Sequence, residues 1–437
     1  MKRNFSNALT GVVDYGAYPL AMLCVAPVML RSLGASSYGV WLAAMAMLNI
    51  GAIAASGFGD ANIQRVAALR HHGDHTALHD TVRAAMSIHL VLGIALFGVG
   101  WMVAASLALK MTQGIPELTR PATEAFRIVS IAILLRAIES VCVSTVRGFE
   151  QFARAIRISA ILRVVSIAVA AAFACSGFGL VAIVGSSTAI TAVSTVLQIA
   201  DTRRFLCAAT LAPAWRWAPL KSIFTFGFFS WLLAIAGVVF TQADRLLVGA
   251  GLGATALAAY GLSAQICQPT YGALSAGLHF LFPHLASTHA QAPERTPHVL
   301  RTAVLFNLGA AIASVLFTVL FGRLVLNHWI GTEAGRAAAA LLPLMAAATG
   351  LMALSIPAYY AALALEQVRV LATICLAAAI SALVLIRMFT PVFGVNGAVY
   401  ARAGYGLIML LSYLPLSGFL FGSRRRFAPS VAMQEEA

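Results

Sequence analysis

The stretch LGASSYG, residues 33–39, follows the first apolar segment of the chain, and a shorter copy of it recurs half a chain later. The copy consists of LGA at residues 252–254 and YG at residues 260–261, directly after the seventh apolar segment. Each copy leads into a segment rich in Gly and Ala. A repeat at corresponding places predicts that the chain folds as two similar halves.

The composition places these segments in a membrane. Of the 437 residues, 60% are apolar and 10% are charged, whereas soluble domains contain roughly 45–50% and 25%. A soluble chain of this length would need charged surfaces around two or three domains, so a soluble enzyme and a disordered chain are both excluded. The net charge is +14. No run of basic residues with interleaved aromatic residues stands outside the apolar segments, so nucleic acid is not an expected partner.

A helix that spans a bilayer requires about 20 mostly apolar residues, and the sequence contains twelve such segments. The long run at 158–199 holds two of them, with residues 176–179 (SGFG) as the turn. We predict an all-α polytopic membrane protein with about twelve transmembrane helices in two pseudo-symmetric six-helix halves, which enclose a central site. The predicted spans are 8–30, 39–59, 84–109, 123–146, 158–176, 178–199, 222–248, 255–281, 302–322, 338–360, 368–390 and 395–418.

The distribution of basic residues predicts the orientation. The N-terminus, the even-numbered loops and the C-terminal tail hold 18 Lys and Arg residues, and the odd-numbered loops hold 6. Because cytoplasmic loops carry the excess of Lys and Arg, both termini are expected in the cytoplasm. The predicted organisation is an N-terminal six-helix half at 1–200, a cytoplasmic linker at 201–221, a C-terminal half at 222–418 and a basic cytoplasmic tail at 419–437.

Two motifs resemble those of a known family. The stretch LRSLGASSYGVW, residues 30–41, resembles the signature after the first helix of the polysaccharide flippases. These proteins belong to the multidrug/oligosaccharidyl-lipid/polysaccharide exporter superfamily. The stretch TQADRLLVGAGLG at 241–253, followed by Tyr260, is similar to the family's pattern at the seventh helix, where an Asp precedes an apolar run.

The resemblance implies a transporter of the bacterial inner membrane, not an enzyme. It would move undecaprenyl-pyrophosphate-linked oligosaccharide units from the cytoplasmic to the periplasmic leaflet by alternating access, for the synthesis of surface polysaccharides. The implied partners are this lipid-linked substrate, the membrane lipids and enzymes of polysaccharide assembly. No cofactor and no metal are expected, since the six cysteines are dispersed and lack metal-ligand spacing.

Arginine residues inside the predicted spans are the candidates for binding an anionic substrate. A charge in the bilayer is costly and should face a wet cavity or a partner, and guanidinium binds phosphate through two parallel donors. Arg127 is interpreted as structural, because it lies near the end of its span and on the face opposite to Arg136. The substrate-binding candidates are Arg136, Arg163, Arg402 and Arg245.

Acidic residues within the spans are candidates for coupling transport to a proton or sodium ion. They are Asp14, Glu139 and Asp244. Burial raises the pKa of a carboxyl group and a neighbouring Arg lowers it, so movement between wet and paired states would couple ion and substrate. The alternative is static pairing, for which Arg136 and Glu139, three residues apart on one helix face, are the plainest pair.

Two other function classes remain open. A multidrug or peptidoglycan-precursor exporter would share this architecture, although a drug exporter should favour acidic and aromatic cavity groups over Arg. An integral-membrane sugar transferase acting on polyprenyl phosphates would need paired carboxylates or a DxD-like metal site, and the sequence contains no such motif.

Overall fold

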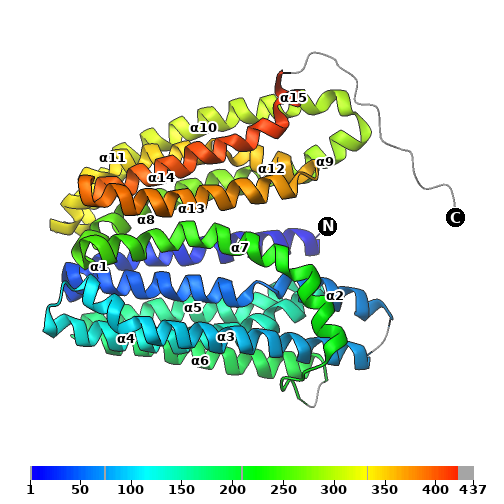
Figure 1. Ribbon diagram of the computed structural model, residues 1–437, viewed down its shortest axis with the longest axis horizontal. Helices are drawn as coiled ribbons and strands as arrows, with labels where there is room; N and C mark the ends of the chain where they lie inside the picture. The colour runs from blue at the N-terminus through cyan, green and yellow to red at the C-terminus, as the bar shows by residue number, and fades with distance from the viewer. Residues whose placement is uncertain (1, 73–74, 208–209, 332, 422–437) are drawn as a thin grey trace.

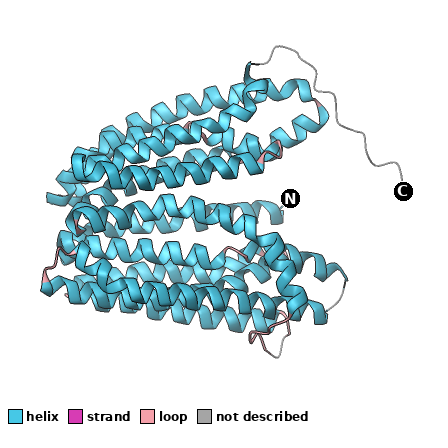
Figure 2. Ribbon diagram, in the orientation of Figure 1, coloured by secondary structure: helices cyan, strands magenta, loops and turns pink. Residues whose placement is uncertain are grey.

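The computed structural model describes residues 2–72, 75–207, 210–331 and 333–421, and for some residues within its helices it describes the backbone alone. In this part of the chain every regular element is a helix (Figure 2). The helices of the first half are α1 (Lys2–Ser56), α2 (Gly59–His72), α3 (His75–Met111), α4 (Pro116–Gly148), α5 (Phe152–Cys175) and α6 (Leu180–Phe205).

The second half begins with α7 (Trp217–Leu252) and contains more short elements than the first. The helices are α8 (Ala254–Leu278), α9 (Leu281–Gln291), α10 (Thr296–Leu324), α11 (Glu333–Ala353), α12 (Ile356–Ala364), α13 (Val368–Phe393), α14 (Val395–Met409) and α15 (Ser417–Phe421), with short 3-10 segments at Pro293–Arg295 and Leu410–Leu416 and a π-helix at Val325–Ile330.

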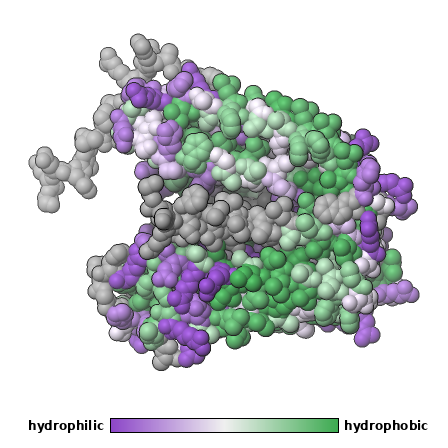
Figure 3. All heavy atoms as spheres, turned by 180° about the vertical axis from the view of Figure 1, so that it is seen from behind, coloured by the Kyte–Doolittle hydropathy of each residue, from purple (hydrophilic) through white to green (hydrophobic). Residues whose placement is uncertain are grey.

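The helices form two lobes that lie side by side (Figure 1). We call α1–α6 the N-lobe and α8–α15 the C-lobe, and α7 lies between them. Among the described residues, nine helical segments are long and apolar enough to cross a membrane. A green hydrophobic surface extends over both lobes and purple hydrophilic residues gather at the two ends (Figure 3). The predicted all-α, two-lobed, polytopic membrane fold is confirmed.

All twelve predicted spans fall on helices, and three differences have physical causes. The predicted tenth span, 338–360, is divided into α11 and α12, because Pro357 at the start of α12 cannot donate to the preceding turn. The predicted twelfth span is α-helical as far as Met409. Beyond it the chain continues as a 3-10 segment that contains Pro415. Two helices outside the spans, α2 and α9, were not predicted.

The repeated motifs form two turns with the same backbone conformation. Gly34 divides α1 into two helices and has φ 75° and ψ 166°, and Gly253 between α7 and α8 has φ 89° and ψ 167°. A residue with a side chain is strained in this region of φ and ψ. Both turns therefore require glycine at the second position of their LGA sequence, which explains why this part of the repeat is retained.

We expect Gly34→Ala to lower the free energy of unfolding by about 1–3 kcal/mol, the cost of a non-glycine residue in this conformation. A new Cβ at Gly34 meets no atom within 4 Å, so the effect comes from the backbone alone. Thermal melting in detergent measures it. Gly185→Ala is the matched control, because Gly185 lies in α6 with open space around it. Equal melting temperatures for both variants would contradict the strain.

The two turns bring the lobes together at the end of the molecule opposite to the termini (Figure 1). Ser36 Oγ lies 2.9 Å from Thr255 Oγ1, and Tyr38 donates to Gln265 Oε1 at 3.4 Å. A Cβ at Gly39 would lie 1.8 Å from the carbonyl oxygen of Ala254, so the two backbones touch with no side chain between them. From these turns the helices of the two lobes diverge toward the opposite end of the molecule, where α2 and α9 lie (Figure 1).

Helix α7 contacts both lobes. In its first half, the indole nitrogen of Trp231 donates to the carbonyl of Ala54 at 2.7 Å, and its ring stacks on Phe58 of the N-lobe. In its second half, Asp244 is bonded to residues of the C-lobe. The predicted boundary at residue 222 therefore lies in the first turns of a helix that both lobes share. The predicted domain limits remain a prediction.

Candidate functional site

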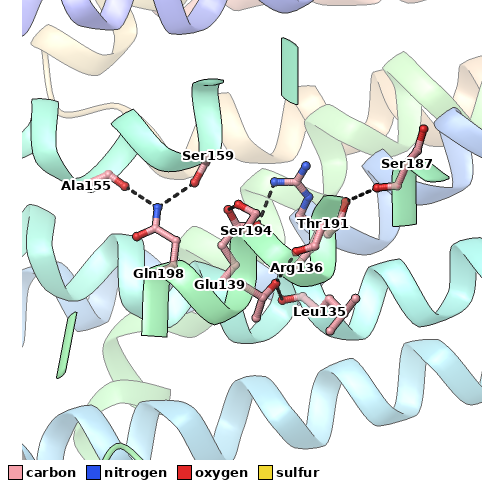
Figure 4. Close-up of polar contacts among 10 residues, drawn as sticks. Leu135, Arg136, Glu139, Ala155, Ser159, Ser187, Thr191, Ser194 and Gln198 are labelled. Atoms are coloured by element: carbon pink, nitrogen blue, oxygen red, sulfur yellow. Dashed lines mark hydrogen bonds and ion pairs between the residues drawn. The ribbon is translucent and has the colours of Figure 1, made fainter. Parts of the chain in front are cut away.

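Two predicted residues meet in the middle of α4. The guanidinium of Arg136 donates from Nη1 to Glu139 Oε2 at 2.9 Å, and Ser194 on α6 donates to Glu139 Oε1 at 2.9 Å (Figure 4). The carboxylate is only 3% exposed, whereas the side chain of Arg136 keeps 16% exposure. Because both carboxylate oxygens are held, Glu139 fixes the position of the guanidinium.

This pair on α4 contacts a polar stripe on α6 that sequence analysis missed. Gln198 donates from Nε2 to Ser159 Oγ at 2.9 Å and to the carbonyl of Ala155 at 3.0 Å, both on α5 (Figure 4). Thr195 donates to the carbonyl of Leu135 on α4 at 3.3 Å. Such bonds join helices where no water competes. The signal was a spacing of three or four between polar residues in an apolar helix: Thr191, Ser194, Thr195, Gln198 and Thr202, all buried.

A second cluster joins α7, α8 and α14. Asp244 is 2% exposed, and its Oδ2 accepts from Tyr260 at 2.6 Å and from Arg402 Nη1 at 3.0 Å. Its Oδ1 accepts from the backbone nitrogen of Arg245 at 2.7 Å. A buried ion pair is tolerated only when its remaining hydrogen-bonding capacity is satisfied, and this carboxylate meets that condition.

The structure thus distributes the predicted residues over two clusters. Arg136 and Glu139 lie in the N-lobe, and Asp244, Arg245 and Arg402 lie around the start of the C-lobe. Arg245 is buried. Arg163 is half-buried on α5. The side chain of Asp14 lies outside the described part of the chain.

The chemistry of both clusters is that of a carboxylate held by a guanidinium and a hydroxyl. A proton or metal cation that binds Glu139 or Asp244 must therefore compete with an arginine. The described residues contain no group of three His, Cys, Asp or Glu side chains placed to hold a metal ion.

Comparison with known sequences decides the family. The sequence pattern of the family described as "Polysaccharide biosynthesis protein" matches residues 28–330, more than half of the chain. The chain belongs to this polysaccharide biosynthesis family. The resemblance seen in the motifs at 30–41 and 241–253 is confirmed, and both motifs lie within the matched range. None of the curated proteins gives a significant match.

Solved structures of several transporters share the fold of this chain. The chain is similar to "Lipid II flippase MurJ, inward closed conformation", with a TM-score of 0.75, 12% identity and coverage of 94% of this chain and 89% of that one. An inward-facing multidrug resistance MATE family transporter matches with a TM-score of 0.69, 15% identity and coverage of 92% and 95%. An outward-facing MATE family transporter matches with a TM-score of 0.59, 16% identity and coverage of 95% of this chain and 96% of that one. These likenesses establish the fold.

Proposed function

We propose that this polysaccharide biosynthesis family member flips undecaprenyl-pyrophosphate-linked oligosaccharide units from the cytoplasmic to the periplasmic leaflet. The family match carries the proposal, and a two-lobed fold shared with a lipid II flippase supports it. The guanidinium groups in both lobes suit a pyrophosphate, because an arginine stays charged and binds phosphate oxygens in pairs. Association with polysaccharide assembly enzymes stays a prediction.

We further propose that both termini face the cytoplasm of a bacterial inner membrane, as the distribution of basic residues predicts. The joined turns around Gly34 and Gly253 then lie on the periplasmic side, and the end at which the helices of the two lobes diverge faces the cytoplasm. In this conformation the protein would accept a substrate from the cytoplasmic leaflet. Parting of the turns would release it on the other side.

Arg136 is the residue that we propose as the first contact of the pyrophosphate. It is partly exposed and is held by Glu139, whose other carboxylate oxygen accepts a hydrogen bond from Ser194. Arg163, Arg245 and Arg402 are proposed to extend the cationic path. Because Glu139 and Asp244 are paired with arginines, ion coupling would act by exchange: a guanidinium that binds pyrophosphate leaves its carboxylate ready for a proton or sodium ion.

The test is sidedness in proteoliposomes that contain a fluorescent pyrophosphate-linked oligosaccharide. Protein-dependent transfer is measured as the fraction that an external sugar-modifying enzyme cannot reach. We expect Arg136→Ala to reduce the initial rate about 10-fold or more, equivalent to a loss of about 1.4 kcal/mol of binding. Arg136→Lys should give an intermediate rate, because it keeps the charge and loses the paired donors.

Arg323→Ala is the control, since this exposed arginine lies at the end of α10, away from both clusters. Rates are compared at equal amounts of folded protein. Full activity of Arg136→Ala would remove this residue from the path. Transfer of a pyrophosphate-linked muropeptide in place of the oligosaccharide, or of a cationic dye, would favour the peptidoglycan-precursor or multidrug exporter. Transfer without either ion gradient would contradict coupling at Asp14, Glu139 and Asp244.

A further inference from the structure

Arg127 lies in the first half of α4 and has no partner of opposite charge in the described part of the chain. It follows Pro116 by about three helical turns, roughly 16 Å at 1.5 Å per residue. Its guanidinium lies over the ring of Trp101 on α3, 5.1 Å from the centroid, and its buried Nε has no hydrogen-bond partner among the described residues. An arginine within a membrane-spanning helix should face a partner or a wet cavity.

The side chain of Arg127 lines an open groove of about 600 Å³ on the outer half of α4. Side chains on a helix extend toward its N-terminus, so Arg127 reaches back toward Arg120 at the mouth of the groove. Arg120 is 87% exposed and donates to Glu124 at 3.3 Å. The groove thus contains two guanidiniums and one carboxylate, an excess of one positive charge. Its lining residues are Pro116, Thr119, Arg120, Thr123, Glu124 and Arg127.

The threonines of this groove do not compete for the arginines. Thr119 donates to the carbonyl of Ile115, and Thr123 donates to the carbonyl of Thr119. Their hydroxyl hydrogens are therefore engaged within the helix, and the donors that face the groove are guanidinium groups. A ligand that matches them is an anion with several acceptor oxygens.

The surface around the groove is apolar and exposed. On α3 the exposed side chains include Met102, Val103 and Leu109, and on α4 they include Ile131. In a membrane-spanning protein, exposed apolar side chains at this level contact lipid chains. A ligand of the groove therefore combines an anionic headgroup with hydrocarbon chains that continue along α3 and α4.

We propose that this groove binds the phosphate of a lipid headgroup in the leaflet adjacent to the α3–α4 connection. Arg127 holds the phosphate from below, and Arg120 covers it from the aqueous side. The indole of Trp101 shields the other face of the Arg127 guanidinium, an arrangement that orients its donors toward the groove. Two lipids present this chemistry, an anionic phospholipid of the bilayer and a polyprenyl pyrophosphate.

Native mass spectrometry of the full chain in detergent tests the proposal, with dioleoylphosphatidylglycerol as the probe and dioleoylglycerol as a probe that lacks the phosphate. The wild type should bind phosphatidylglycerol at least 5-fold more tightly than Arg127→Ala, and both should bind dioleoylglycerol equally. Arg127→Lys should fall between them. Arg387→Ala is the matched control, because this exposed arginine near the end of α13 lies outside the groove.

Equal binding of phosphatidylglycerol by the wild type and Arg127→Ala would overturn the proposal, as would an equal loss in Arg387→Ala. Farnesyl pyrophosphate as a competitor distinguishes the two sources: displacement of phosphatidylglycerol indicates that the groove also takes pyrophosphate lipids, and its failure assigns the site to phospholipid. Thermal melting reports whether Arg127→Ala folds. If it does not fold, Arg127→Lys and Arg120→Ala carry the test, and unchanged affinity in both overturns the site.

Discussion

A disulfide between Ser36→Cys and Thr255→Cys is expected to abolish transport, and reduction of the disulfide is expected to restore it. The two hydroxyl oxygens are 2.9 Å apart at the joined turns, so cysteine sulfurs in their places would lie close to the S–S distance of about 2.0 Å. Because alternating access requires these turns to part, a covalent bond should hold the protein in a single conformation. The six native cysteines are first replaced, so that only the new pair can form a disulfide. The rate of substrate transfer in proteoliposomes is then measured before oxidation, after oxidation and after reduction.

The control for this bond is a disulfide inside one lobe. Asn62 on α2 donates to Ser144 on α4 at 2.8 Å, and both residues lie within the N-lobe. In the variant with Asn62→Cys and Ser144→Cys, neither oxidant nor reductant should change the rate of transport. Ser36→Cys alone controls for the oxidant. Undiminished transfer by a fully cross-linked Ser36/Thr255 variant would show that the turns do not separate during the cycle.

Replacement of either Asp244 or Arg402 by an uncharged residue is expected to lower the free energy of unfolding by about 3–5 kcal/mol, because the partner is left as a buried charge. The side chains of this pair are 2% and 14% exposed. The double variant Asp244→Asn, Arg402→Met should be more stable than either single one, since no charge then remains. A double-mutant cycle of melting temperatures in detergent measures the coupling.

The pair formed by Arg154 and Asp201 is the matched comparison. Its atoms are 2.9 Å apart, against 3.0 Å for Asp244 and Arg402, but its side chains are 36% and 23% exposed. The same cycle should therefore yield about 0–1 kcal/mol. Additive effects at Asp244 and Arg402 would show that the two charges are not coupled. A stable Asp244→Asn that transports normally would also remove Asp244 from the ion-coupling candidates.

Much of the fold could be predicted because a membrane imposes strong local rules. A run of about 20 apolar residues forms a helix in a bilayer whatever surrounds it, and the turn between α5 and α6 lies where residues 176–179 interrupt such a run. The repeat at Gly34 and Gly253 predicted two halves, and both glycines have the same unusual conformation. The helices α2 and α9 were not predicted, because they are too short or too polar to resemble membrane spans.

The candidate site was predictable only where its partners are close in sequence. Arg136 and Glu139 are three residues apart on one helix, and their ion pair was expected. The pairing of Arg402 with Asp244 joins residues 158 positions apart, and no local pattern encodes it. Ser194 and Tyr260 carry no charge, so neither was among the predicted site residues, and Tyr260 was noted only as part of a family motif. Both complete the hydrogen bonding of a buried carboxylate.

The backbone contact between Gly39 and Ala254 also bears on the electrical potential across the membrane. A lipid-linked glycan is far wider than a proton, so a passage large enough for it would dissipate the membrane potential if both ends opened together. Where two helices touch without an intervening side chain, hardly any space remains for a continuous file of water. In the flippase that we propose, the same close approach that joins the lobes would therefore act as an electrical insulator while the opposite end receives substrate.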